Sequence, residues 1–142
     1  MMTDGIQTFL AEAGESGCYA ICLVKVAEKY KKKDFDLIKS LELGIEKKCI
    51  LYNKKDRNDN DNFYVLNPAT FLFYLTGKHW DCRKEDYPYT AKGGEYIIER
   101  WERNKTGVIT GHFEMQDFHP IENSLTVQYG KIVSCRVLKP VN

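Results

Sequence analysis

A cysteine at the start of an apolar stretch is the residue best placed in this chain for covalent chemistry. Cys18 follows the small-residue turn Ser16-Gly17, and an apolar run over residues 19–24 begins directly after it. If this run is helical, the thiol lies in the first turn, near backbone N–H groups and the positive end of the helix dipole. Both favour the nucleophilic thiolate. Cys18 is therefore the candidate nucleophile, and the competing interpretation is a small buried core residue.

A histidine far downstream is the candidate base. His112 lies in residues 108–116, where polar and apolar side chains alternate as in a strand. Alternation puts His112 on the more polar face with Glu114 and Gln116, and puts the intervening, mostly apolar residues on the other face. Imidazole exchanges protons near neutral pH, which suits a general base. The competing interpretation is a hydrogen-bonded surface histidine.

A catalytic histidine also needs a polar group that orients its second ring nitrogen. Asp117 and His119 are the nearest candidates, and Asn123 is a more distant one. Asp117 and His119 follow His112 by odd numbers of residues, so a straight strand would turn both away from it. A bend before Pro120 would bring either one back. The sequence leaves the choice between Asp117 and His119 open.

Gln7 is the candidate for stabilising an oxyanion. Its side-chain amide, together with the backbone N–H of Cys18, would form a workable pair of donors. Gln7 borders the apolar stripe of a predicted amphipathic helix, so a solvated surface glutamine is the alternative.

A metal site is the other chemical option that we considered. His79 and Cys82 are three residues apart, and Cys18 and Cys22 are four apart. Neither spacing is that of a usual zinc knuckle, and each pair would need ligands from elsewhere in the chain. We therefore expect no metal and no other cofactor.

The composition is that of an ordinary soluble globular protein. The chain has 142 residues, 43% of them hydrophobic and 29% charged, which predicts one domain over residues 1–142. Its net charge of +1 gives no electrostatic reason to propose nucleic acid or an anionic membrane as a partner. The sequence does not indicate an oligomeric state.

The lack of a recognisable targeting segment, together with the number and spacing of the cysteines, predicts a cytoplasmic protein. Residues 1–5 lack the basic segment and apolar core of a signal peptide, and no apolar run approaches the roughly 20 residues of a membrane span. The five cysteines are an odd number and form no CxxC pair. We therefore expect free thiols in a reducing compartment.

The predicted elements indicate an α+β fold. Periodicity predicts helices over 4–13, 18–30, 34–45 and 69–75, the last with Asn67 as N-cap, Pro68 in the first turn and Gly77 as stop. Strands are predicted over 49–52, 108–116, 124–129 and 132–138, with a hairpin turn at Gly130-Lys131. Residues 95–101 fit a strand or a helix, and we favour the strand. Residues 53–62 should form an exposed loop, and residues 79–92 should be irregular. Helices followed by an antiparallel sheet are typical of α+β proteins, with the buried Cys18 helix packed on the C-terminal sheet.

Two short motifs resemble the papain-like cysteine peptidase superfamily. These are Gly17-Cys18-Tyr19 opening a buried helix and Gly111-His112-Phe113 on a strand. The chain is most similar to the bacteriocin-leader-peptidase-like and phage-associated small papain-like proteins. In those proteins the histidine strand is followed by an Asp-Pro element and a terminal hairpin, and residues 119–134 resemble that ending.

The resemblance implies a papain-like fold in which a cysteine thiolate, a histidine base and an orienting polar residue hydrolyse a peptide or amide through a thioester. Two positions depart from the pattern: His119 stands where the family has Asp before Pro, and Gln7 lies farther from Cys18 than the family's glutamine does. The expected function is therefore a thiol hydrolase acting on a peptide or amide substrate. The alternative is a catalytically inactive papain-like binding protein.

Overall fold

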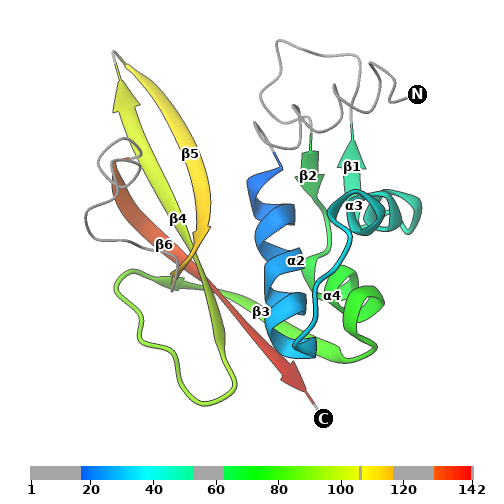
Figure 1. Cartoon of the computed structure of the whole chain (residues 1–142). Helices are drawn as coiled ribbons and strands as arrows, with labels where there is room; N and C mark the ends of the chain where they lie inside the picture. Colours follow the sequence, from blue (N-terminus) through cyan, green and yellow to red (C-terminus); the bar gives the residue numbers. More distant parts are fainter. Residues whose placement is uncertain (1–16, 53–62, 106, 117–129, 142) are drawn as a thin grey trace. The chain divides into compact units, whose positions relative to one another are not determined.

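The computed structural model describes residues 17–52, 63–105, 107–116 and 130–141 (Figure 1). Within these residues the chain forms three helices and two antiparallel sheets, so the predicted α+β class is confirmed. The chain divides into two compact units, residues 1–79 and 80–142. The predicted helix over 4–13, the loop over 53–62, the strand over 124–129 and the hairpin that this strand would form lie outside the described residues. The papain-like arrangement stays a prediction.

The first unit is built around helix α2, Cys18–Lys31. This helix is apolar on nearly all sides of its first turns, and its buried residues are Ala20, Cys22, Leu23, Val24, Val26 and Ala27. It ends at Lys32, whose left-handed backbone (φ 56°) lets its N–H bond to the carbonyl of Glu28. Helix α2 packs against α3 and α4. The prediction of a buried helix over 18–30 is confirmed.

Helices α3, Leu37–Glu46, and α4, Pro68–Thr76, both begin at side-chain caps. The carboxylate of Asp36 accepts the N–H of Lys39 at 3.0 Å, and the amide oxygen of Asn67 accepts the N–H of Thr70 at 3.1 Å. Each bond satisfies a backbone donor that has no partner inside its helix. Helix α4 ends at Gly77, which adopts φ 77°. Both helices were predicted, α4 with its cap and its stop.

The two short strands of the first unit pair with each other. Strand β1, Ile50–Tyr52, runs antiparallel to β2, Phe63–Val65, with Ile50 opposite Val65. Ile50 is buried, while Leu51 and Tyr64 lie opposite each other and are exposed. The strand predicted over 49–52 is confirmed.

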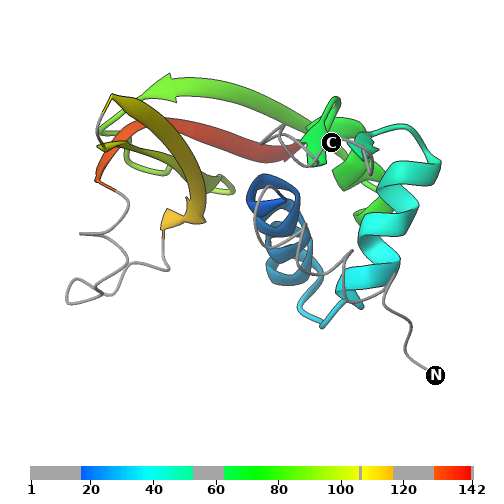
Figure 2. The ribbon, with the colours of Figure 1, turned by 90° about the horizontal axis from the view of Figure 1, so that it is seen from above.

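The second unit is built on a four-stranded sheet with the order β3-β6-β4-β5. Its strands are β3, His79–Asp86, which starts one residue before the unit, β4, Tyr96–Lys105, β5, Val108–Met115, and β6, Lys131–Val141. Strand β4 is antiparallel to both of its neighbours, and β3 and β6 lie side by side in both views (Figures 1 and 2). The strands predicted over 95–101, 108–116 and 132–138 are confirmed.

The prediction of irregular structure over 79–92 is wrong for its first part, because β3 occupies residues 79–86. The stretch shows little hydrophobic alternation, since most of its residues are charged. Trp80 anchors its beginning and is 6% exposed. Farther along, the guanidinium of Arg83 is paired with two carboxylates, those of Glu85 and Glu95. Ion pairing therefore takes the place of apolar burial on this strand.

The strand register assigns each side chain of the sheet to a face. We call one side the histidine face; it carries Ile97, Glu99, Trp101, His112, Glu114, Cys135 and Val137. Ile97, Cys135 and Val137 form a buried cluster there, and Tyr89 packs against it. On the opposite face, Phe113 lies close to the guanidinium groups of Arg100 and Arg136. The predicted separation of His112 and Glu114 from Phe113 is confirmed.

Candidate functional site

The thiol of Cys18 lies at the N-terminus of the buried helix α2. Cys18 is the first residue of the helix and is half-buried, and the preceding Gly17 is the N-cap. The first helical bond runs from the N–H of Ile21 to the carbonyl of Gly17 at 2.9 Å. The structure describes the whole of α2, and its first turn contains no acidic residue. The partial positive charge at this end of the helix therefore favours a thiolate.

The other four thiols lie in different environments. Cys22, Cys49 and Cys135 are buried, and burial raises the pKa of the Cys49 and Cys135 thiols. Cys82 is half-buried, and burial together with the charge of Asp81 raises its pKa to about 12. The thiolate is thus disfavoured at three of the four, and the remaining one, Cys22, is 5% exposed.

His112 lies on β5, opposite Trp101 of β4, and forms a close pair with a carboxylate. Its Nε2 atom is 3.1 Å from Oε1 of Glu114, two residues farther along the same strand. The side chains of His112 and Glu114 are 21% and 11% exposed, so solvent screens the pair only partly. A carboxylate at one ring nitrogen fixes the orientation of an imidazole.

A second, buried carboxylate lies beside this pair. Glu99 of β4 is directly opposite Glu114 and is 2% exposed. The side-chain amide of Gln116 donates to Glu99 at 3.3 Å and to the backbone carbonyl of Tyr89 at 3.2 Å. His112, Glu114 and Glu99 of the histidine face are thus joined by Gln116, which binds Glu99 and the segment that contains Tyr89.

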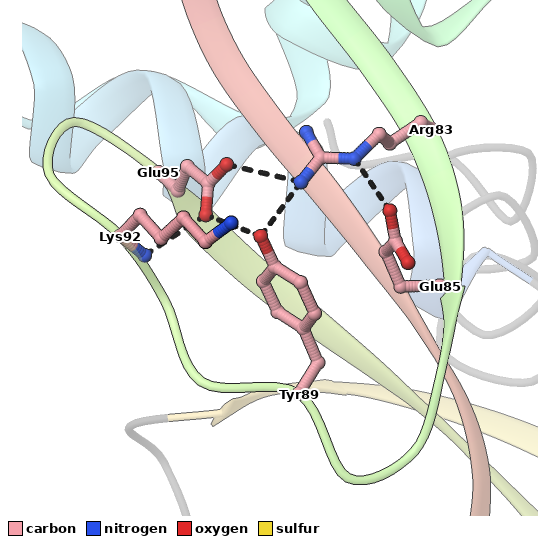
Figure 3. Close-up of polar contacts among 5 residues, drawn as sticks. All are labelled: Arg83, Glu85, Tyr89, Lys92 and Glu95. Carbon is pink, nitrogen blue, oxygen red and sulfur yellow. Dashed lines mark hydrogen bonds and ion pairs between the residues drawn. The ribbon is translucent and has the colours of Figure 1, made fainter.

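An ionic network holds that segment to the strands around it (Figure 3). Arg83 donates to Glu85 at 2.7 Å, to the hydroxyl of Tyr89 at 2.6 Å and to Glu95 at 3.1 Å. Glu95 also accepts the hydroxyl of Tyr89 at 2.8 Å and the backbone N–H of Lys92 at 2.9 Å.

These bonds change the ionisation of the groups in the network. The N–H of Lys92 is the main cause that lowers the pKa of Glu95 to about 2, and the bonds from Tyr89 and Arg83 act in the same direction. The bond to Glu95 raises the pKa of Tyr89. The network thereby fixes the position of Tyr89, whose carbonyl binds Gln116.

The structure describes two of the predicted site residues, Cys18 and His112, and does not describe the others. Cys18 belongs to the first unit and His112 to the second, and each is described within its own unit. Asp117, His119 and Gln7 lie outside the described residues, as does Asn123.

The sequence does not single out Glu114 as the partner of His112, although the alternation of the strand puts the two on one face. Residues two apart on a strand are about 7 Å apart along the chain, a distance that a glutamate spans. In the part of the chain that the structure describes, no three His, Cys, Asp or Glu side chains group as metal ligands would.

Comparison with protein-family models, with curated protein sequences and with solved structures found no match to this chain. The papain-like resemblance rests on the motifs around Cys18 and His112. Among the described helices, none combines the length and the apolar character needed to cross a membrane.

Proposed function

We propose that the protein is a thiol hydrolase that cleaves a peptide or amide bond, with Cys18 as nucleophile and His112 as general base. The observation that carries the proposal is the contrast between Cys18 and the other thiols. Cys18 is half-buried at the positive end of a helix, whereas burial raises the thiol pKa of three of the other four and Cys22 is buried. The carboxylate beside His112 supports the second half of the proposal, because it stabilises an imidazolium.

The proposed reaction has two stages. His112 takes the proton of the Cys18 thiol, and the thiolate attacks the carbonyl carbon of the substrate. The C–N bond then breaks, the departing amine takes the proton from the imidazolium, and a thioester remains on Cys18. In the second stage His112 takes a proton from water, the resulting hydroxide attacks the thioester, and the carboxylic acid leaves as the thiol is restored.

We propose the cytoplasm as the compartment in which this chemistry takes place. All five cysteines lie in the described residues and no disulfide joins them, which fits a reducing compartment. The oxyanion would be stabilised by the backbone N–H of Cys18 and by the side chain of Gln7, as the sequence predicts.

Limited alkylation tests the proposal. The native protein is treated with a small excess of iodoacetamide at pH 7, and peptide mass spectrometry follows the labelling of all five cysteines. Cys18 should react at least about tenfold faster than the next thiol, Cys82, because the thiolate is the reactive form. In urea the five rates should converge. Slow and uniform labelling of the native protein would instead favour the inactive binding protein.

A further inference from the structure

We infer that Glu114 is the residue that orients His112 in the proposed reaction. This inference rests on the proposed function and deepens it, because the sequence offered Asp117, His119 and the more distant Asn123 for the role. The contact that carries it is the 3.1 Å distance between His112 Nε2 and Glu114 Oε1, formed within one strand of one structural unit.

Residues of β4 and β6 lie around the pair. Glu99 faces Glu114 directly from β4. Cys135 lies beyond Glu99 on β6, and Trp101 lies opposite His112. The amide of Gln116 is engaged by Glu99 and by the carbonyl of Tyr89. Contact with His112 pairs Glu114 with a group that becomes cationic in the proposed reaction.

This geometry assigns different tasks to the two ring nitrogens of His112. With Glu114 accepting the Nε2–H, the nitrogen that takes the proton of the Cys18 thiol is Nδ1. The proton moves from Cys18 Sγ to Nδ1, while Glu114 keeps its bond to Nε2–H. The negative charge of Glu114 then offsets the positive charge that His112 acquires, so the thiolate–imidazolium pair forms more readily. Glu114 is thus a positioning residue that acts through His112.

Glu102 provides a matched control. It also lies on the β4–β5 pair and contacts a cationic side chain, with its Oε2 atom 3.4 Å from Nη2 of Arg100. Glu102 is opposite Gly111, on the other face of the sheet from His112. Glu102→Gln therefore removes the same charge from the same pair of strands without touching the imidazole.

The first measurement observes the contact itself by proton NMR of the full chain. A carboxylate that accepts Nε2–H gives a downfield imidazole proton protected from exchange, and His112→Ala assigns it by its loss. We expect this signal in the wild type and in Glu102→Gln, and we expect it to move upfield or broaden in Glu114→Gln. Absence of the signal in the wild type overturns the inference without any variant having to fold.

The second measurement connects the contact to the reaction. Alkylation of Cys18 by iodoacetamide is followed between pH 5 and 7 in the same proteins. Glu114→Gln should slow it about tenfold or more, because the imidazole then loses the residue that holds it in place for proton transfer. Glu114→Asp should restore part of the rate, and Glu102→Gln should stay within twofold of the wild type.

The results for His112→Ala and Glu114→Gln distinguish the inference about Glu114 from the proposed function. If His112→Ala slows the labelling and Glu114→Gln does not, the inference about Glu114 is overturned while the proposed function stands, with Asp117 or His119 as the orienting residue. If His112→Ala leaves the labelling unchanged, both claims are overturned.

Discussion

Two glutamates bind the same arginine in this protein, and they should contribute very differently to stability. Glu95 accepts bonds from Arg83, Tyr89 and the N–H of Lys92, and its side chain is 5% exposed. Glu85 accepts one bond from Arg83 and is 38% exposed. Glu95→Gln keeps a neutral acceptor but removes the charge, so we expect a loss of about 1.5–3 kcal/mol in the free energy of unfolding. Glu85→Gln should cost at most about 1 kcal/mol, as is usual for exposed ion pairs.

The pH dependence provides an independent check of the same contacts. The pKa of Glu95 falls from its ordinary 4.5 to about 2 in the folded protein. The unfolded chain therefore binds a proton first as the pH falls, and the contribution of Glu95 is complete above pH 4.5 and lost as the pH falls through about 2. Urea unfolding at pH 7, 4 and 3 should show the difference between wild type and Glu95→Gln shrinking with acid. Equal losses for the Glu95 and Glu85 variants, or a difference independent of pH, would refute this reasoning.

Two substitutions in the first unit test its packing and its caps, each measured by urea unfolding. Gly44→Ala should destabilise by about 1–3 kcal/mol, because the added Cβ would lie 2.5 Å from Ile50 Cδ1 and 2.9 Å from Phe71 Cε1. A gain of up to about 1 kcal/mol, which helix propensity alone predicts, would contradict this packing. Asn67→Ala should cost about 0.5–2 kcal/mol, because it removes the acceptor for the N–H of Thr70. An unchanged midpoint for Asn67→Ala would show that this cap contributes nothing.

Local signals in the sequence were sufficient for most elements of the fold. Helix α4 could be predicted with both of its ends because Asn67, Pro68 and Gly77 each act on the backbone beside them. Strand β3 could not be predicted, since Arg83 is paired with Glu95 from beyond the strand, and such pairing leaves no periodic signal.

For the candidate site, too, local signals in the sequence were sufficient for one residue and insufficient for another. The position of Cys18 followed from a turn and an apolar run, both of which are local. The partner of His112 was sought beyond the end of the strand, at Asp117 and His119, whereas the described contact is to Glu114 on the same strand. Alternation puts two residues on one face, but it does not indicate that they touch. The position of Glu99 opposite Glu114 depends on the pairing of β4 with β5, which joins residues distant in the sequence.

The pairing of Cys18 with His112 is the central claim, and the pH profile of Cys18 alkylation tests it most directly. The rate constant for iodoacetamide is measured from pH 4 to 9 in the wild type and in His112→Ala, with equilibrium unfolding as the check that both proteins are folded. A thiolate–imidazolium pair predicts a reactive limb at acidic pH in the wild type, and loss of this limb in His112→Ala, where only the ordinary alkaline ionisation remains. Superimposable profiles for the two proteins would contradict the claim.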